Sequence, residues 1–139
     1  MTRFALSYAA SLFTVMVLDG LWLGLIAKPL YASGVGHLLA VKPNFVAAGV
    51  FYLVFSLGLW VFAVLPQTSF MGLSGFSGTA WRAAALGLLC YATYDLTNLA
   101  TLKDWPVTLS IIDMVWGSAL SATSALAGYW VLSRMPPVA

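Results

Sequence analysis

Three carboxylic acids interrupt segments that are otherwise apolar, and they are the residues of this sequence best suited to chemistry. Asp19 lies in LDGLWLG, Asp95 in YATYDLTN and Asp113 in IIDMVWG. A carboxylate in apolar surroundings is costly unless a cation, a proton or water compensates its charge. The three acids therefore form a candidate site for a proton or a positively charged group.

Aromatic and polar side chains accompany these acids at helical spacing. Trp22 and Trp116 each follow an aspartate by three residues, which places acid and indole on one helix face. Around Asp95, polar side chains at spacings of three and four share a second face. We expect an acidic pocket lined by aromatic rings and made of Asp19, Trp22, Tyr31, Tyr91, Tyr94, Asp95, Asn98, Asp113 and Trp116.

The composition identifies the surroundings of the acids. Of the 139 residues, 62% are hydrophobic and 7% are charged, whereas a soluble domain carries roughly a quarter charged residues. This predicts an integral membrane protein with one domain, residues 1–139. The net charge of +2 comes from six scattered basic residues, which excludes the basic stripe of a nucleic-acid-binding protein.

Four apolar runs are long enough to cross about 30 Å of hydrocarbon at about 1.5 Å per residue. They predict an all-α membrane protein with four transmembrane helices in an antiparallel bundle, at residues 4–27, 45–65, 80–102 and 108–132. The first run is longer than the core of a cleaved signal peptide and contains Asp19, so we expect it to remain in the mature protein.

The connecting segments are predicted as loops. In residues 28–44, Pro29, Gly34, Gly36 and Pro43 are expected to break any regular element, leaving an interfacial loop. Residues 67–79 are uncharged and rich in glycine and serine, which predicts a flexible loop at the headgroups.

Helix direction brings the three acids to one depth. The first and third runs cross in the same sense, so Asp19 and Asp95 lie about 10 to 12 Å below the side at which those runs end. Asp113 lies about 8 Å below the same side, where the fourth run begins. Three neighbouring carboxyls cannot all ionise, so at least one is expected to keep its proton at pH 7.

Small residues predict how the helices pack. The fourth run shows a seam at steps of three and four that is typical of close membrane helix packing, and it consists of Ser110, Asp113, Gly117, Ser121, Ser124 and Gly128. In the first run, Gly20 and Gly24 form a small-xxx-small pair. The second run carries no charge and is interpreted as a structural wall of the bundle.

Charge flanking the runs gives a slight orientation signal. Arginines lie on the side of the termini and lysines on the other in equal numbers, so the positive-inside rule alone does not decide. Asp104 on the lysine side favours both termini in the cytoplasm.

A single cysteine, Cys90, excludes an internal disulfide, and a single histidine, His37, excludes paired-histidine haem ligation within one chain. We expect no cofactor, and the sequence leaves a metal open.

The motifs LDGLWLG and YDLTNLATLKDWPVTLSIIDMVWG resemble a bacterial family of small predicted inner-membrane proteins, domain of unknown function 2177. The resemblance covers nearly the whole chain and falls on Asp19, Trp22, Gly24, Tyr31, Tyr94, Asp95, Asn98, Lys103, Trp105, Pro106, Asp113, Trp116 and Gly117. It implies a four-helix protein of the bacterial inner membrane and no established activity.

Three functions fit these observations. The first is a binding or transport protein whose acidic pocket takes a proton, a metal cation or a cationic amphiphile, acting among membrane lipids as a homo-oligomer. The second is an enzyme or accessory subunit acting on lipid acyl chains with an aspartate as general acid or base; the lack of a redox-cofactor motif and of paired histidines disfavours it. The third is a structural or assembly protein.

Overall fold

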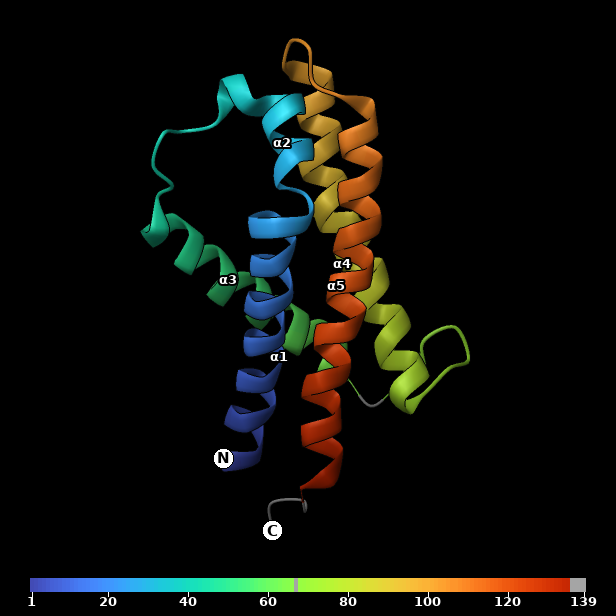
Figure 1. The fold of residues 1–139 in the computed structure, drawn as a ribbon. Helices are drawn as coiled ribbons and strands as arrows, with labels where there is room; N and C mark the ends of the chain where they lie inside the picture. The colour runs from blue at the N-terminus through green and yellow to red at the C-terminus, as the bar shows by residue number, and fades with distance from the viewer. Residues whose placement is uncertain (67, 136–139) are drawn as a thin grey trace.

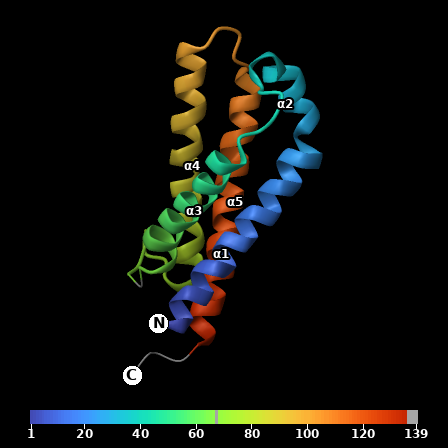
Figure 2. The same cartoon turned by 90° about the vertical axis from the view of Figure 1, so that its left-hand side faces the viewer.

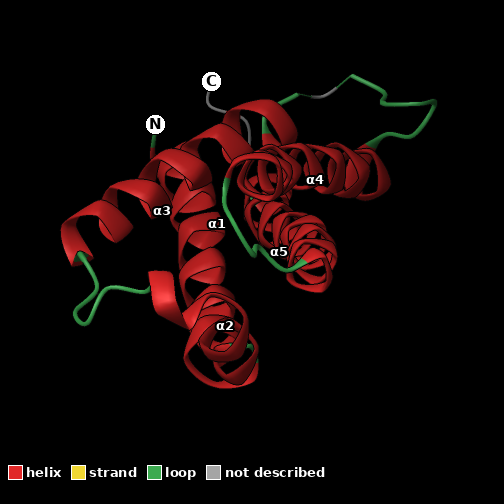
Figure 3. Ribbon diagram, turned by 90° about the horizontal axis from the view of Figure 1, so that it is seen from above, coloured by secondary structure: helices red, strands yellow, loops and turns green. Residues whose placement is uncertain are grey.

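The computed structural model describes residues 1–66 and 68–135, and within them every regular segment is helical (Figures 1 and 3). The α-helices are α1 (Thr2–Leu21), α2 (Lys28–Val35), α3 (Phe45–Leu59), α4 (Gly75–Thr101) and α5 (Val107–Arg134). Single π-helical turns extend α1 (Trp22–Ile26) and α3 (Trp60–Val64), and a 3-10 turn follows α2 (Gly36–Leu38). The predicted all-α class is confirmed.

Three helical segments are long and apolar enough to cross a membrane, counted over the described residues: Thr2–Ile26, Phe45–Val64 and Val107–Arg134. The fourth long helix, α4, has 27 residues and a length of about 40 Å. Glycines, threonines, Arg82 and Asp95 make it more polar than the other three.

The long helices α1, α4 and α5 form the body of the molecule, and α5 packs against both of the others. Its beginning and the end of α4 lie at one end of the molecule, together with α2 (Figure 1). The beginning of α1 and the last turn of α5 lie at the opposite end. Seen from the side, α3 runs obliquely across this body (Figure 2).

Small residues allow α5 to approach its neighbours closely, and the predicted seam is confirmed because all six of its residues are buried. A methyl group on Gly117 would lie 2.2 Å from the Tyr91 ring of α4, and one on Gly128 would lie 2.1 Å from Ser11 Oγ of α1. The Ser7 hydroxyl donates to the Gly128 carbonyl oxygen at 2.8 Å. The seam of α5 is therefore buried against other helices of the same chain and is not available to a second copy.

The other glycine pair behaves differently. A methyl group on Gly20 or Gly24 would meet no atom within 4 Å, so this pair brings no helix of the same chain close to α1. Both glycines lie on the exposed surface.

The expectation that residues 28–44 form an irregular loop was wrong for the first part of that segment. Pro29 lies in the first turn of α2, where its missing N–H leaves no hydrogen bond unmade. Gly34 lies within that helix, and a methyl group there would be 3.0 Å from the Pro106 ring. The two residues read as helix breakers thus start the helix and let it pack on the α4–α5 connection. The exposed His37 follows in the 3-10 turn.

The expected start of the third long helix at residue 80 was also wrong, because α4 begins at Gly75. A tight turn precedes it, with paired backbone hydrogen bonds between Phe70 and Leu73 and positive φ angles at Met71 and Gly72. Gln67, the first residue of the predicted loop, lies outside the described residues.

Arg82 ties the start of α4 to the end of the second span. Its guanidinium group donates to the carbonyl oxygens of Ala63 at 3.3 Å, Pro66 at 2.8 Å and Thr68 at 2.6 Å. The Ala63 carbonyl belongs to the last turn of the helix, where carbonyls lack a partner within the helix, and the other two belong to the segment that follows.

Candidate functional site

Asp19 of α1 receives hydrogen bonds from two other helices. The Tyr52 hydroxyl of α3 donates to Oδ2 at 2.9 Å, and the Trp116 indole N–H of α5 donates to Oδ1 at 3.1 Å. Both oxygens of this carboxylate, which is only 4% exposed, therefore accept a hydrogen bond. Asp19 thus joins three helices at one point.

Asp113 of α5 is held from the other side. The Tyr31 hydroxyl of α2 donates to Asp113 Oδ1, so the short helix that replaces the predicted loop brings this tyrosine to the acid. Burial, together with this bond to a carboxylate, raises the pKa of Tyr31 above its ordinary value. Tyr31 therefore remains a proton donor over the whole physiological pH range.

Two indoles connect the acids. The rings of Trp22 and Trp116 stack with centroids 4.3 Å apart and planes 8° from parallel. The Trp22 ring lies close to Tyr31 and Asp113, although its N–H does not reach hydrogen-bond geometry. The predicted pairs were Asp19 with Trp22 and Asp113 with Trp116. In the structure, the Trp116 N–H of α5 bonds the acid of α1, and Trp22 lies close to the acid of α5.

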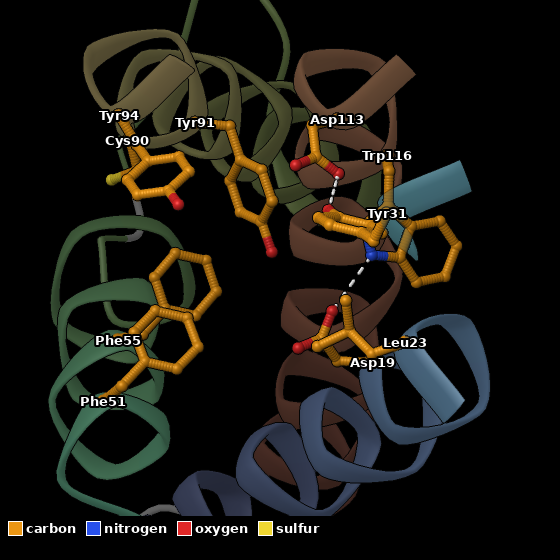
Figure 4. Close-up of a pocket in the computed structure, with 10 residues that line it drawn as sticks. All are labelled: Asp19, Leu23, Tyr31, Phe51, Phe55, Cys90, Tyr91, Tyr94, Asp113 and Trp116. Carbon is orange, nitrogen blue, oxygen red and sulfur yellow. Dashed lines mark hydrogen bonds between the residues drawn. The ribbon is translucent and has the colours of Figure 1, made fainter. Parts of the chain in front are cut away.

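A cavity of about 390 Å³ opens beside this network. Figure 4 shows the acids with Tyr31 and Trp116 along one side, the phenyl rings of Phe51 and Phe55 facing them, and the Tyr91 hydroxyl directed into the space between. Its walls come from all five α-helices and the first π-helical turn: Asp19, Leu23, Tyr31, Phe51, Phe55, Cys90, Tyr91, Tyr94, Asp113 and Trp116. A cavity of this size, mostly aromatic with a few placed polar groups, is typical of small-molecule sites.

The third acid lies apart from the cavity wall. Asp95 is completely buried, and neither of its carboxylate oxygens meets hydrogen-bond geometry with another group. The Ser110 hydroxyl is its polar neighbour and accepts the Trp105 indole N–H at 2.9 Å. Asp113 lies within electrostatic reach of both other acids, so the three are neighbours while only two face the cavity.

Of the nine predicted site residues, the structure brings six to the cavity wall, and Trp22 stacks directly behind it. Asp95 and Asn98 do not line the cavity. Asn98 lies beside Tyr94 on the same helix. Asp95 and Asn98, in the last two turns of α4, therefore lie behind the cavity wall and do not form part of it.

The second span contributes more than the structural wall expected of it. Sequence reasoning missed Tyr52, which bonds to Asp19, and the cavity residues Leu23, Phe51, Phe55 and Cys90. The sequence signal for Tyr52 was available, since it is the one hydroxyl-bearing aromatic residue in an uncharged span. The two phenylalanines carry no such signal, because phenylalanine is common on any lipid-facing surface.

The site offers two carboxylates, neutral donors that hold them, and apolar walls. Among the described residues, no group of three or more histidine, cysteine, aspartate or glutamate side chains is arranged to hold a metal ion. No lysine or arginine lines the cavity. The arrangement can compensate a positive charge or exchange a proton at one edge while enclosing an apolar group at the other.

Fold and site together define a small helical membrane protein with several candidate spans and a buried network of aspartates and aromatic side chains. The chain belongs to the family described as predicted membrane protein, domain of unknown function 2177 (DUF2177), whose model matches residues 4–130. No curated protein and no solved structure matches the chain. The family resemblance of the sequence motifs is thus confirmed.

Proposed function

We propose that this protein binds the positively charged head of an amphipathic molecule at Asp19 and Asp113. The observation that carries the proposal is that two buried carboxylates on one cavity wall receive hydrogen bonds only from neutral donors. Neutral donors reduce the cost of burying a charge without cancelling the charge itself. A cationic group in the cavity would supply the missing positive charge.

The remaining walls support an amphipathic ligand over a free inorganic cation. Phe51, Phe55 and Leu23 lie opposite or beside the acids, and they offer no oxygen ligand to a metal ion. Tyr91 and Trp116 present aromatic surface, on which an alkylated ammonium group is favourably bound by cation–π attraction. An organic ammonium group attached to an apolar body satisfies both sides of the cavity.

The membrane arrangement is part of the proposal. We take α4 as a fourth span beside the three apolar ones, so that the two ends of the chain lie on one side, in the cytoplasm, of a bacterial inner membrane. We also propose a homo-oligomer in lipid. Since the α5 seam is filled within the chain, the open face of α1 at Gly20 and Gly24 is the candidate contact.

Binding of dodecylammonium to the purified protein in a neutral detergent tests the head-group site. We expect binding by the wild type and at least an approximately tenfold loss, ~1.4 kcal/mol, in Asp19→Asn and Asp113→Asn. Asp104→Asn is the matched control, because Asp104 lies outside the cavity and is exposed in the α4–α5 turn. An uncharged amphiphile of the same chain length controls for adsorption to the apolar surface.

Equal affinity of the wild type and the two pocket variants would overturn the proposal, as would equal binding of the charged and uncharged amphiphiles. Thermal melting of each variant separates a lost site from a lost fold. Lowering the pH should also weaken binding by the wild type, because protonation removes the charge that attracts the ammonium group.

A further inference from the structure

A second cavity adjoins the first and lies between the second span and α4. It has a volume of about 620 Å³ and is lined almost entirely by apolar side chains, among them Val50, Val54, Leu86 and Phe62. We call it the α3–α4 groove. None of its lining residues carries a charge, so the groove is suited to hydrocarbon.

The groove and the acidic cavity share a wall. Phe51, Phe55 and Cys90 line both, and the two phenyl rings are stacked with centroids 5.5 Å apart. The two cavities are therefore adjacent, and a ligand that extended from the carboxylates past these rings would enter the groove.

Helix packing explains why the groove exists. The π-helical turn Trp60–Val64 makes the main contact between the second span and α4, while α3 packs on α1. The two helices consequently diverge from that contact, and a methyl group on Gly58 would meet no atom within 4 Å. Val50, Val54 and Phe62 are 55%, 64% and 66% exposed, so in a bilayer the groove opens sideways to lipid.

The size of the groove indicates its occupant. Its lining runs from Ala47 to Phe62, which is about 22 Å along a helix. One leaflet of the hydrocarbon core is roughly 15 Å deep, so the groove is long enough for a lipid-length hydrocarbon chain. A single hydrocarbon chain is thin enough to fit.

We propose that the ligand of the acidic cavity is a single-chain cationic amphiphile, which enters sideways from the bilayer and lays its hydrocarbon chain in the α3–α4 groove. This inference rests on the proposed head-group site. It adds the ligand's tail, the route of entry and the orientation of the bound molecule, with the ammonium group at the acids and the chain directed away from them along α3.

Cysteine protection tests the position of the chain. The native Cys90 is the only cysteine and lines both cavities, so the Cys90→Ala protein serves as the background once its affinity for dodecylammonium has been shown to match that of the wild type. Single cysteines are then placed at Val54, inside the groove, and at Leu57, on the same helix outside it. Both positions are exposed, at 64% and 50%. The rate of N-ethylmaleimide labelling is measured with dodecylammonium, with methylammonium and without either amine.

We expect dodecylammonium to slow labelling of the Val54→Cys protein at least threefold and to leave the Leu57→Cys protein unchanged. Methylammonium should protect neither position, and Asp113→Asn should remove the protection. Binding of dodecylammonium that depends on Asp113 but protects neither cysteine would overturn the groove and leave the head-group site standing. Protection that persists in Asp113→Asn, or equal protection at both positions, would overturn the joined site.

A failure of dodecylammonium to bind the wild type at all would instead overturn the head-group proposal. Replacement of Gly58 by leucine provides a second measurement, because its side chain would fill the groove. Gly58→Leu should abolish protection of the Val54→Cys protein. Gly49→Leu, on the same helix and also in open space, should preserve it.

Discussion

The Trp116 indole donates its N–H to Asp19 on α1, at 3.1 Å, although Asp113 lies one turn before it on α5. The hydrogen bonds of the acids therefore run between helices and not within one helix. Asp19 also accepts a hydrogen bond from the Tyr52 hydroxyl. Removal of this single side chain would therefore leave a hydrogen-bond donor without its acceptor on each of two other helices. Such shared buried partners are where mutational effects fail to add.

A double-mutant cycle between Tyr52→Phe and Asp19→Ala should show a coupling of about 1 kcal/mol, since each change removes one end of the same hydrogen bond. Unfolding free energies in one detergent provide the measurement. The matched cycle pairs Asp19→Ala with Tyr8→Phe, because the Tyr8 hydroxyl donates to the Leu53 carbonyl instead. Additivity in the first cycle, or equal coupling in both, would contradict the assigned contact.

Gly117→Ala should lower the free energy of unfolding by about 1 to 3 kcal/mol, because the added methyl group would overlap the Tyr91 ring at 2.2 Å. Gly49→Ala is the control in open space and should be neutral or stabilising by up to about 1 kcal/mol through helix propensity. Thermal melting of both variants checks the sign of each effect. Indistinguishable melting curves would rule out the close α4–α5 approach.

Asp95→Asn should fold and melt at or above the wild-type temperature, because it removes an ionisable group that is completely buried. It should also keep its affinity for dodecylammonium within about twofold, since Asp95 does not line the cavity. The same titration performed on Asp113→Asn gives the contrast. A loss of affinity in Asp95→Asn as large as in Asp113→Asn would place Asp95 in the binding site.

Reporter fusions after Leu39, Ser69 and Lys103 should alternate in location, because these residues follow successive proposed spans. A phosphatase and a fluorescent reporter at each position report the two sides independently. Two consecutive fusions on the same side would reject the four-span arrangement, most directly by removing α4 from the membrane.

Cross-linking tests the proposed oligomer. A cysteine at Gly24 in the Cys90→Ser background should form a disulfide-linked dimer in native membranes, whereas a cysteine at Gly117 should not, since that position is buried inside the chain. Dimer formation at neither position would count against the α1 contact.

Apolar length and small-residue spacing were sufficient to predict the helical class and the face that α5 buries, because both depend on neighbours within one helix. The partners of the acids could not be predicted in the same way. Tyr52 and Trp116 reach Asp19 from separate helices, and helix rotation and tilt, which set such contacts, leave no local periodicity in a uniformly apolar span.

The short helix α2 was missed because local signals were given too much weight. Proline and glycine were interpreted as helix breakers in residues 28–44, yet Pro29 starts the helix and Gly34 lets it rest against Pro106. Their effect depends on their position in the helix and on the neighbouring surface. That misreading mattered for the site, because α2 supplies Tyr31.

The three carbonyls held by Arg82 have a mechanical consequence for the α3–α4 groove. They fix one end of the second span to the start of α4, while at the other end the Asn44 side chain only caps its own helix, accepting the backbone N–H groups of Val46 and Ala47. The arginine holds one end of the span, and the middle of α3 is held on α1 by packing and by the Tyr52–Asp19 and Tyr8–Leu53 hydrogen bonds. A swing of α3 about the arginine clamp that widened the groove would therefore have to break the hydrogen bonds that tie α3 to α1.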